Sequence, residues 1–169
     1  MTPTSFPGLA RLLRAGALDA ELAALVWILA EGGLPVHVAA EDPSDAEPLA
    51  RGLEDLVRPI SVLAGGSLDA VMAETTIEKA LLGVVLVVDE GRLAAAHWVR
   101  PPLRDGAGHV RAQGPAVLAT WDARIGRFEH FAWGVTPELA AVVGRKPGDF
   151  EIEHRSRTDQ LTALTTGPH

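Results

Sequence analysis

Apolar residues recur with helical spacing in the first part of this chain. From Leu18 to Glu31 they fall on one face of a predicted helix, with Asp19 in position to cap its start and Gly32–Gly33 ending it. The residues of this face are Leu22, Leu25, Val26 and Leu29, with Trp27 beside them. A shorter pattern from Phe6 to about Ala15 predicts a preceding helix, which Gly16 breaks.

Continuous apolar runs predict buried strands in the next part of the chain. They lie at Leu34–Ala40, Ile60–Ala64 and Gly83–Val88. After the first strand we expect a polar turn, Glu41–Asp45, and a helix from Ala46 to about Leu56. After the second strand, Ser67 can cap a helix from Leu68 to about Thr75. Helices between strands indicate parallel βα units.

The second half of the chain predicts hairpins. Glu90–Gly91 is a turn that leads into a strand at Leu93–Val99, and after a polar loop at Pro101–Gly114 a second hairpin pairs Pro115–Trp121 with Arg127–Trp133. We expect Thr136 to cap a short helix that ends at Val143. A last helix is expected over Asp149–Leu164, followed by a frayed end, with apolar anchors at Phe150, Ile152 and Leu161.

These elements predict the α/β class. Residues 1–147 are expected to form a single α/β domain with a central mixed sheet, parallel βα units first and antiparallel hairpins later, flanked by helices. Residues 148–169 are expected to be a C-terminal extension, partly helical.

Composition narrows the function classes. The formal charge of −7 argues against nucleic acid as a partner. No apolar run approaches the roughly 20 residues that span a bilayer, and no secretion signal is evident, so we expect a cytoplasmic protein without membrane insertion. The absence of cysteine excludes disulfides, thiolate metal sites and cysteine nucleophiles.

The strand–loop–helix arrangement at residues 34–56 has the layout of a phosphate-binding P-loop, but its chemistry is opposite. The loop has no glycine, lysine or arginine. It carries instead Glu41, Asp42, Asp45 and Glu47. Clustered carboxylates repel a triphosphate, so we expect no bound nucleotide and no other cofactor.

Three stretches give the chain a family resemblance: LDAELAALVWILAEGGLPVHVAA, LAGGSLDAVMAE and GVVLVV with its hairpin. They resemble the core of the type II/type IV secretion and pilus-assembly ATPases, which implies a P-loop-NTPase-like fold. In the family's phosphate loop, the first glycine, second glycine, lysine and threonine correspond here to Ala40, Asp45, Ala46 and Glu47. Ala64 corresponds to the family's histidine, and only a few residues between Leu53 and Ile60 replace its acidic boxes.

The resemblance therefore implies a contracted, catalytically silent relative. We expect it to bind protein, as an accessory subunit or as a homo-oligomer. Two alternatives stay open. One is a nucleotide-binding ATPase with a non-standard phosphate site, and the other is a small-ligand module whose pocket lies between the sheet and Pro101–Gly114.

Two further segments are weak candidates for nucleotide binding. Val84–Glu90 matches a Walker B string, in which Asp89 would hold magnesium and Glu90 would orient water. A buried strand ending in a hairpin turn gives the same string, and we favour that interpretation. Gly65, Gly66 and Ser67 can bind an anion at a helix start, but a tight turn with an N-cap also explains them, and we favour that interpretation.

Histidines and aromatic residues complete the set of candidates. If the returning strands were neighbours, His97 and His130 could share a metal, although Glu129 would face away from it; we favour no metal site. His37 is expected to be a core histidine. The candidate interface residues are Trp98, Trp121, Phe128, Phe131 and Trp133. They form either a second core layer or an apolar patch for a partner.

Overall fold

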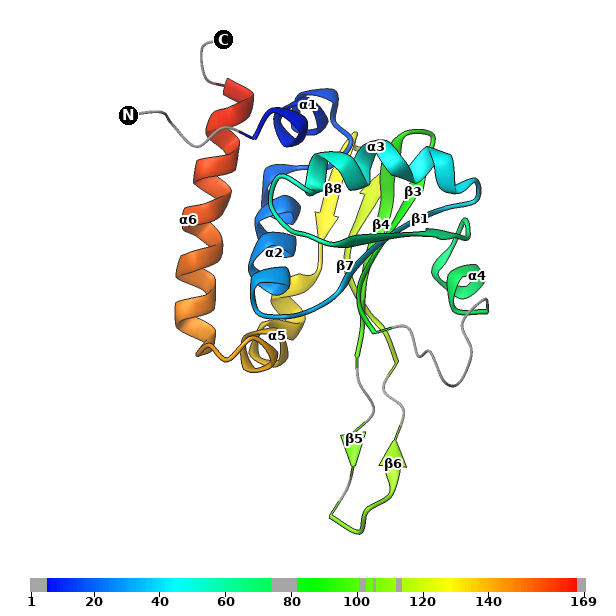
Figure 1. The fold of residues 1–169 in the computed structure, drawn as a ribbon. Helices are drawn as coiled ribbons and strands as arrows, with labels where there is room; N and C mark the ends of the chain where they lie inside the picture. The colour runs from blue at the N-terminus through cyan, green and yellow to red at the C-terminus, as the bar shows by residue number, and fades with distance from the viewer. Residues whose placement is uncertain (1–5, 74–81, 101–102, 105, 112–113, 167–169) are drawn as a thin grey trace.

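A computed structural model of the 169-residue chain describes residues 6–73, 82–100, 103–104, 106–111 and 114–166. Figure 1 shows a central twisted sheet with helices packed against it. The helices are α1 (Pro7–Ala15), α2 (Ala20–Glu31), α3 (Pro43–Leu53), α4 (Leu68–Ala73), the 3-10 turn η1 (Ala132–Val135), α5 (Thr136–Val142) and α6 (Pro147–Thr166). The strands are β1 (Val36–Ala40), β2 (Ile60–Ala64), β3 (Gly83–Asp89), β4 (Arg92–Val99), β5 (Leu103–Arg104), β6 (Val110–Arg111), β7 (Ala116–Asp122) and β8 (Arg127–His130).

The main sheet has six strands in the order β2-β1-β3-β4-β7-β8. Strand β1 is parallel to both of its neighbours, with Val38 opposite Val62 on β2 and Leu86 on β3. From β3 onward every pairing in this sheet is antiparallel. The predicted mixed sheet, with parallel βα units followed by antiparallel strands and flanked by helices, is therefore confirmed.

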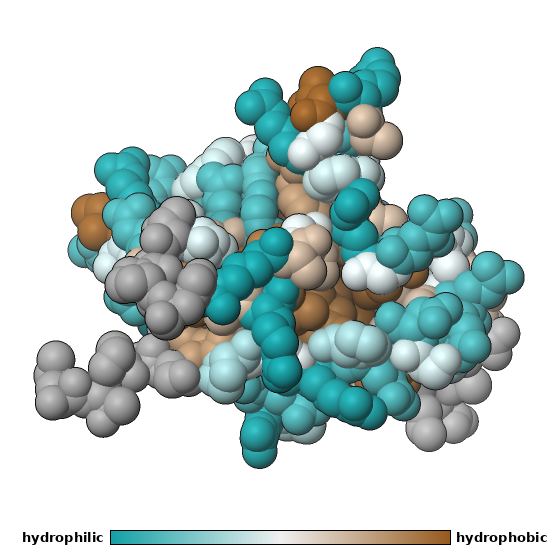
Figure 2. Space-filling model, turned by 90° about the horizontal axis from the view of Figure 1, so that it is seen from above, coloured by the Kyte–Doolittle hydropathy of each residue, from teal (hydrophilic) through white to brown (hydrophobic). Residues whose placement is uncertain are grey.

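The two faces of the sheet are covered unequally. One face packs against α1, α2, α3 and α6 and forms the larger core, in which Leu22, Leu86 and Leu118 are fully buried. The other face holds a smaller cluster, where Leu68 and Val71 of α4 contact Val85 and Val87 of β3. Seen from the side of α1 and α3, the surface is mostly hydrophilic, with an apolar area showing between the outer side chains (Figure 2).

Helix α6 is an integral part of the larger core. It lies along α2 (Figure 1) and buries Phe150 and Leu161 completely. These two residues are anchors as predicted, but the same prediction for Ile152 is wrong, because its side chain is 69 % exposed. The expected frayed end falls partly on residues 167–169, which lie outside the described residues.

Two predicted helix starts differ from the structure. Asp19 caps α2 as predicted, accepting a hydrogen bond of 2.8 Å from the Leu22 N–H. Helix α3, however, begins at Pro43 and not at Ala46, because Asp42 already provides the cap. Thr136 does not cap α5; it is the first residue of that helix, and its hydroxyl donates to the Ala132 carbonyl.

The predicted hairpins are present with adjusted ends. Strand β8 ends at His130, so Trp133 lies in η1 and not in the strand. Within the predicted polar loop, Leu103–Arg104 and Val110–Arg111 pair as a small second sheet. The predicted end of the helix that starts at Leu68, near Thr75, lies outside the described residues. Within the described part of the chain, no helix has both the length and the apolar character to cross a bilayer.

Candidate functional site

The carboxyl ends of the parallel strands are the place where α/β proteins of this topology usually bind ligands. Strands β1, β2 and β3 end at Ala40, Ala64 and Asp89, on the same edge of the sheet. The Gly65 N–H donates to the Ala40 carbonyl at 2.8 Å, so the loops after β1 and β2 begin side by side. The P-loop-like turn after β1 and the Gly65–Ser67 turn after β2 therefore lie side by side at these strand ends.

The start of α3 is closed by its own side chain. The Oδ1 atom of Asp42 accepts hydrogen bonds from the Ser44 N–H at 3.0 Å and the Ser44 hydroxyl at 2.8 Å. These bonds, the backbone bond first, lower the pKa of the exposed Asp42 carboxyl, which stays ionised at neutral pH. Pro43 has no N–H, and the Asp45 N–H donates to the Asp42 carbonyl. The backbone N–H groups at the start of α3 are therefore already used or, at Pro43, absent.

The four positions that correspond to the family's phosphate loop do not converge on a ligand. Ala40 and Ala46 are buried in the core, at 2 % and 0 % exposure. Asp45 and Glu47 are exposed, and Glu47 pairs with Arg51 one turn further along α3 at 3.2 Å. Two of these side chains therefore contribute to packing, and the other two carry negative charge on the surface.

The weak anion site at Gly65–Ser67 has the geometry of a helix cap. The Ser67 hydroxyl accepts from the Ala70 N–H at 3.2 Å, which satisfies the start of α4. The side chain of Glu41 lies directly opposite, because a Cβ added at Gly66 would come within 3.5 Å of the Glu41 Cβ. An anion bound here would meet a carboxylate.

The Walker B-like string ends in a tight hairpin turn. Asp89 is the last residue of β3 and pairs with Arg92 on β4. Glu90 and Gly91 between them both have positive φ angles, of 52° and 76°. A two-residue turn of this kind matches the twist of the flanking strands, as the structural interpretation of the string expected.

The two candidate histidines for a shared metal lie apart. His97 pairs with Val117 on β7, whereas His130 on β8 pairs with Ala119, so β7 separates the two strands. Burial lowers the pKa of His97, and the charge of Asp69 only partly offsets that effect. His37, predicted as a core histidine, is half-buried, with its Nε2 3.0 Å from the Leu82 carbonyl oxygen.

His130 instead meets two carboxylates that sequence reasoning did not connect with it. Its Nε2 lies 2.6 Å from Oδ2 of Asp19 and 2.9 Å from Oε2 of Glu21. The contact joins residues more than 100 positions apart in the chain. The only sequence signal was the Asp-x-Glu pair at the start of a helix, which we interpreted as capping alone. Glu129 is exposed, as strand alternation predicted.

The five aromatic interface candidates divide between core and surface. Trp98 and Phe128 are buried, at 2 % and 8 % exposure, so they form a core layer and are not available to a partner. Trp121 packs edge-to-face on Phe128 with 5.0 Å between ring centres. Phe131 and Trp133 remain 44 % and 45 % exposed. The Trp133 ring also contacts His154, 5.2 Å between centres.

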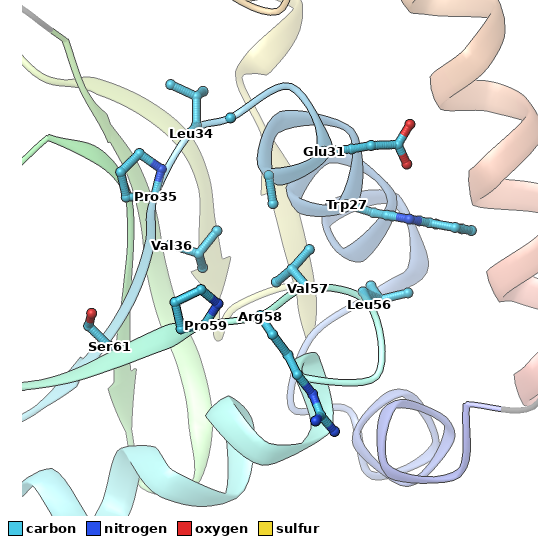
Figure 3. Close-up of a pocket in the computed structure, with 12 residues that line it drawn as sticks. Trp27, Glu31, Leu34, Pro35, Val36, Leu56, Val57, Arg58, Pro59 and Ser61 are labelled. Atoms are coloured by element: carbon cyan, nitrogen blue, oxygen red, sulfur yellow. The ribbon is translucent and has the colours of Figure 1, made fainter.

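A hollow of about 570 Å³ lies between the end of α2, the start of β1 and the segment that leads into β2 (Figure 3). Among the described residues that line it, none comes from the predicted pocket region Pro101–Gly114. Its walls are mainly apolar, and Glu31 and Arg58 provide its charges. The other main lining residues are Trp27, Leu34, Pro35, Val36, Leu56, Val57, Pro59 and Ser61.

Strand β2 adjoins this hollow and forms one edge of the sheet. Among the strands of the described residues its one neighbour is β1, and three of its five residues, Ser61, Val62 and Ala64, are exposed. An edge strand of this kind presents unpaired backbone donors and acceptors.

The protein is a single α/β domain with a mixed six-stranded sheet. A comparison of the sequence with models of known protein families gives no match, and a comparison with curated proteins gives no matching relative.

Proposed function

We propose that this chain is a non-catalytic, protein-binding domain, built like a contracted secretion-ATPase core with a degenerate P-loop. The observation that carries the proposal is the closed start of α3. Asp42 occupies the backbone donors that a P-loop offers to phosphate, and Ala46 is buried where the family has its lysine.

Electrostatics at the same edge supports this assignment. Glu41, Asp45 and Glu47 surround the capped helix start, and the nearby Arg51 is paired with Glu47. A triphosphate placed there would approach several negative charges and gain few hydrogen bonds. Magnesium brought with it would lack the Ser/Thr ligand of the P-loop, because Glu47 replaces that residue.

Strand β2 is the surface on which we place the protein contact. Because the Gly65 N–H points to β1 and alternate residues of a strand point the same way, the Leu63 and Ser61 N–H groups also point to β1. The N–H and C=O of Val62 therefore point to the open edge. An added strand would bond to these groups, as in β-augmentation, and its side chains would reach the apolar hollow that begins at Pro59.

The first experiment separates this function from nucleotide binding. In a thermal unfolding measurement with ATP and magnesium, a true ligand at 100 times its dissociation constant stabilises a protein by about 2.7 kcal/mol. We expect no shift at millimolar nucleotide. A clear shift would favour the alternative in which the Asp89–Glu90 strand end supports an unusual phosphate site.

The second experiment tests the edge itself, with a second copy of the chain as the first partner. We expect light scattering to show association of the wild type that grows with concentration and that Val62→Pro abolishes. Proline removes an N–H that points away from β1, so the fold should survive, which circular dichroism checks. Val62→Thr keeps the N–H and should still associate. A wild-type chain that stays monomeric at every concentration would contradict self-association through β2.

The hollow gives one specific reason to keep a second candidate. Its volume of about 570 Å³ and its apolar walls also suit a small molecule. That function would leave Val62→Pro without effect, because Val62 does not line the hollow.

A further inference from the structure

We propose that Asp19, Glu21 and His130 form a binding site for one divalent transition metal ion of the zinc class. The three side chains come from the start of α2 and the end of β8, and their ligand atoms all lie within 4.8 Å of one another. The site is separate from the degenerate phosphate loop and from strand β2.

The geometry is close to that of a metal site. Imidazole nitrogen and carboxylate oxygen bind zinc at about 2.0–2.2 Å, which places tetrahedral ligands about 3.3 Å apart. The Nε2 of His130 is now 2.6 Å from Asp19 Oδ2 and 2.9 Å from Glu21 Oε2. The Asp19 oxygen therefore needs to move away from Nε2 by about 0.7 Å and the Glu21 oxygen by about 0.4 Å to admit an ion.

The ligand atoms are held by the fold. Asp19 caps α2 through Oδ1, which accepts from the Leu22 N–H at 2.8 Å and so orients Oδ2 toward His130. Glu21 lies in the first turn of that helix, and His130 is held by its pairing with Ala119 on β7. All three side chains are half-buried, so an ion would be only partly hydrated.

The charges favour a dication over an empty site. Two carboxylates with a neutral imidazole carry two negative charges, which the partial positive charge of the α2 start offsets only in part. Arg92 and Arg127 stand with Asp19 around a neighbouring hollow of about 380 Å³. His154 is the titratable neighbour on α6, and its Nε2 lies 2.8 Å from the Glu21 carbonyl oxygen.

A proton is the competitor for this position. The His130 Nε2 lies within hydrogen-bond distance of both carboxylates, so a proton on this nitrogen occupies the position between them in the metal-free state. A metal ion takes the place of that proton, so its affinity increases with pH.

Three protein ligands leave one coordination position open. In zinc proteins with such a set, water or another ligand fills the fourth position. Asp19 lines the hollow of about 380 Å³ beside the cluster, which gives water or a small anion access to the ion.

Titration calorimetry with zinc chloride on the chelator-treated full-length chain tests the site. We expect one zinc ion per chain, proton release on binding, and weaker affinity at pH 6 than at pH 8. The absence of zinc binding at pH 8 would overturn the proposal. A stoichiometry or affinity that His130→Gln leaves unchanged would also overturn it, because the ion would then be adventitious.

Matched variants keep the test independent of folding. His130→Gln and Glu21→Gln each remove one ligand and should weaken binding by about tenfold or more, that is by 1.4 kcal/mol or more. Glu21→Gln leaves the cap of α2 intact, so it serves if His130→Gln fails to fold. His109→Gln changes an exposed histidine just before β6 and should bind zinc like the wild type. Equal loss in His109→Gln would place the ion elsewhere and overturn the proposal.

Discussion

The two edge strands of the main sheet, β8 and β2, have different surroundings. At one edge, β8 ends in His130, which joins the start of α2 through Asp19 and Glu21, and α6 packs along α2. At the other edge, β2 pairs with β1 and with no other strand in the described part of the chain, and most of its residues are exposed. A nucleotide-binding protein would place phosphate-binding groups beside β1 and β2. In this chain, carboxylates and a capped helix start lie there instead.

Under the proposed function, this difference gives the two edge strands different expected roles. On the β8 side, His130 joins Asp19 across more than 100 positions of the chain. On the β2 side, the pair of Glu47 and Arg51 on α3 is local and exposed. We expect substitutions on the first side to change stability, and substitutions on the second to change association.

The largest difference between two substitutions is expected on α6, where Phe150 and Ile152 lie less than one turn apart. Phe150 is 1 % exposed in the larger core, so Phe150→Ala should lower the free energy of unfolding by about 3–5 kcal/mol. Ile152 is 69 % exposed, and Ile152→Ala should stay within about 0.5 kcal/mol. Urea unfolding of both variants measures the contrast. Equal, small effects would show that α6 is a detachable extension.

A smaller effect is expected from two arginines on different helices, α6 and α3. Arg157 is largely buried, bonds both oxygens of Glu31 at 2.9 Å and lies 4.5 Å from the Trp27 ring centre. Because Glu31 is half exposed, we expect Arg157→Ala to cost about 1–2 kcal/mol. Arg51→Ala, which breaks an exposed pair on α3, should cost less than about 0.5 kcal/mol. Thermal unfolding compares the two variants. A larger loss of stability for Arg51→Ala than for Arg157→Ala would contradict this ranking of the buried pair above the exposed one.

The smallest effect is a pair of pH dependences with opposite sign. The pKa of His130 is raised, so its contribution to stability is complete below the unfolded-state pKa and is lost as pH rises through the folded-state pKa. The pKa of His97 is lowered by burial, so stability falls as pH drops below the unfolded-state pKa of about 6.5. Each contribution should be about 1 kcal/mol or less.

Unfolding of metal-free protein at several pH values measures both slopes. His130→Gln should remove the decrease in stability toward alkaline pH, and His97→Gln should remove the decrease toward acidic pH. The two variants control for each other. Identical pH profiles for the two variants would mean that neither imidazole has the pKa shift that the structure indicates.

Local chemistry made much of the fold predictable. Asp19 capped its helix as expected, and β2 has the predicted bounds, because capping and apolar runs act within a few residues. The start of α3 was misjudged because Asp42, Pro43 and Ser44 are typical of turns and of helix starts alike. Ile152 was misjudged because an apolar residue on a polar helix need not face the core.

The candidate sites were less predictable, for a physical reason. Adjacent positions on the sheet depend on strand order, which pattern alone does not give. The sequence left open a metal shared by His97 and His130 if their strands were neighbours, although we favoured no metal site. In the structure β7 separates the two strands, and His130 contacts Asp19. Trp98 and Trp133 looked alike in the sequence, and only packing separates a buried tryptophan from an exposed one.

The burial of Ala46 has a consequence for any attempt to build a phosphate site at this loop. Its side chain faces the interior between α3 and the sheet, so a lysine at that position would have its ammonium group in an apolar environment, far from any bound phosphate. Ala46→Lys alone would therefore destabilise the fold before it restored any affinity for phosphate. A phosphate site at this loop would need several positions to change together, the helix cap included.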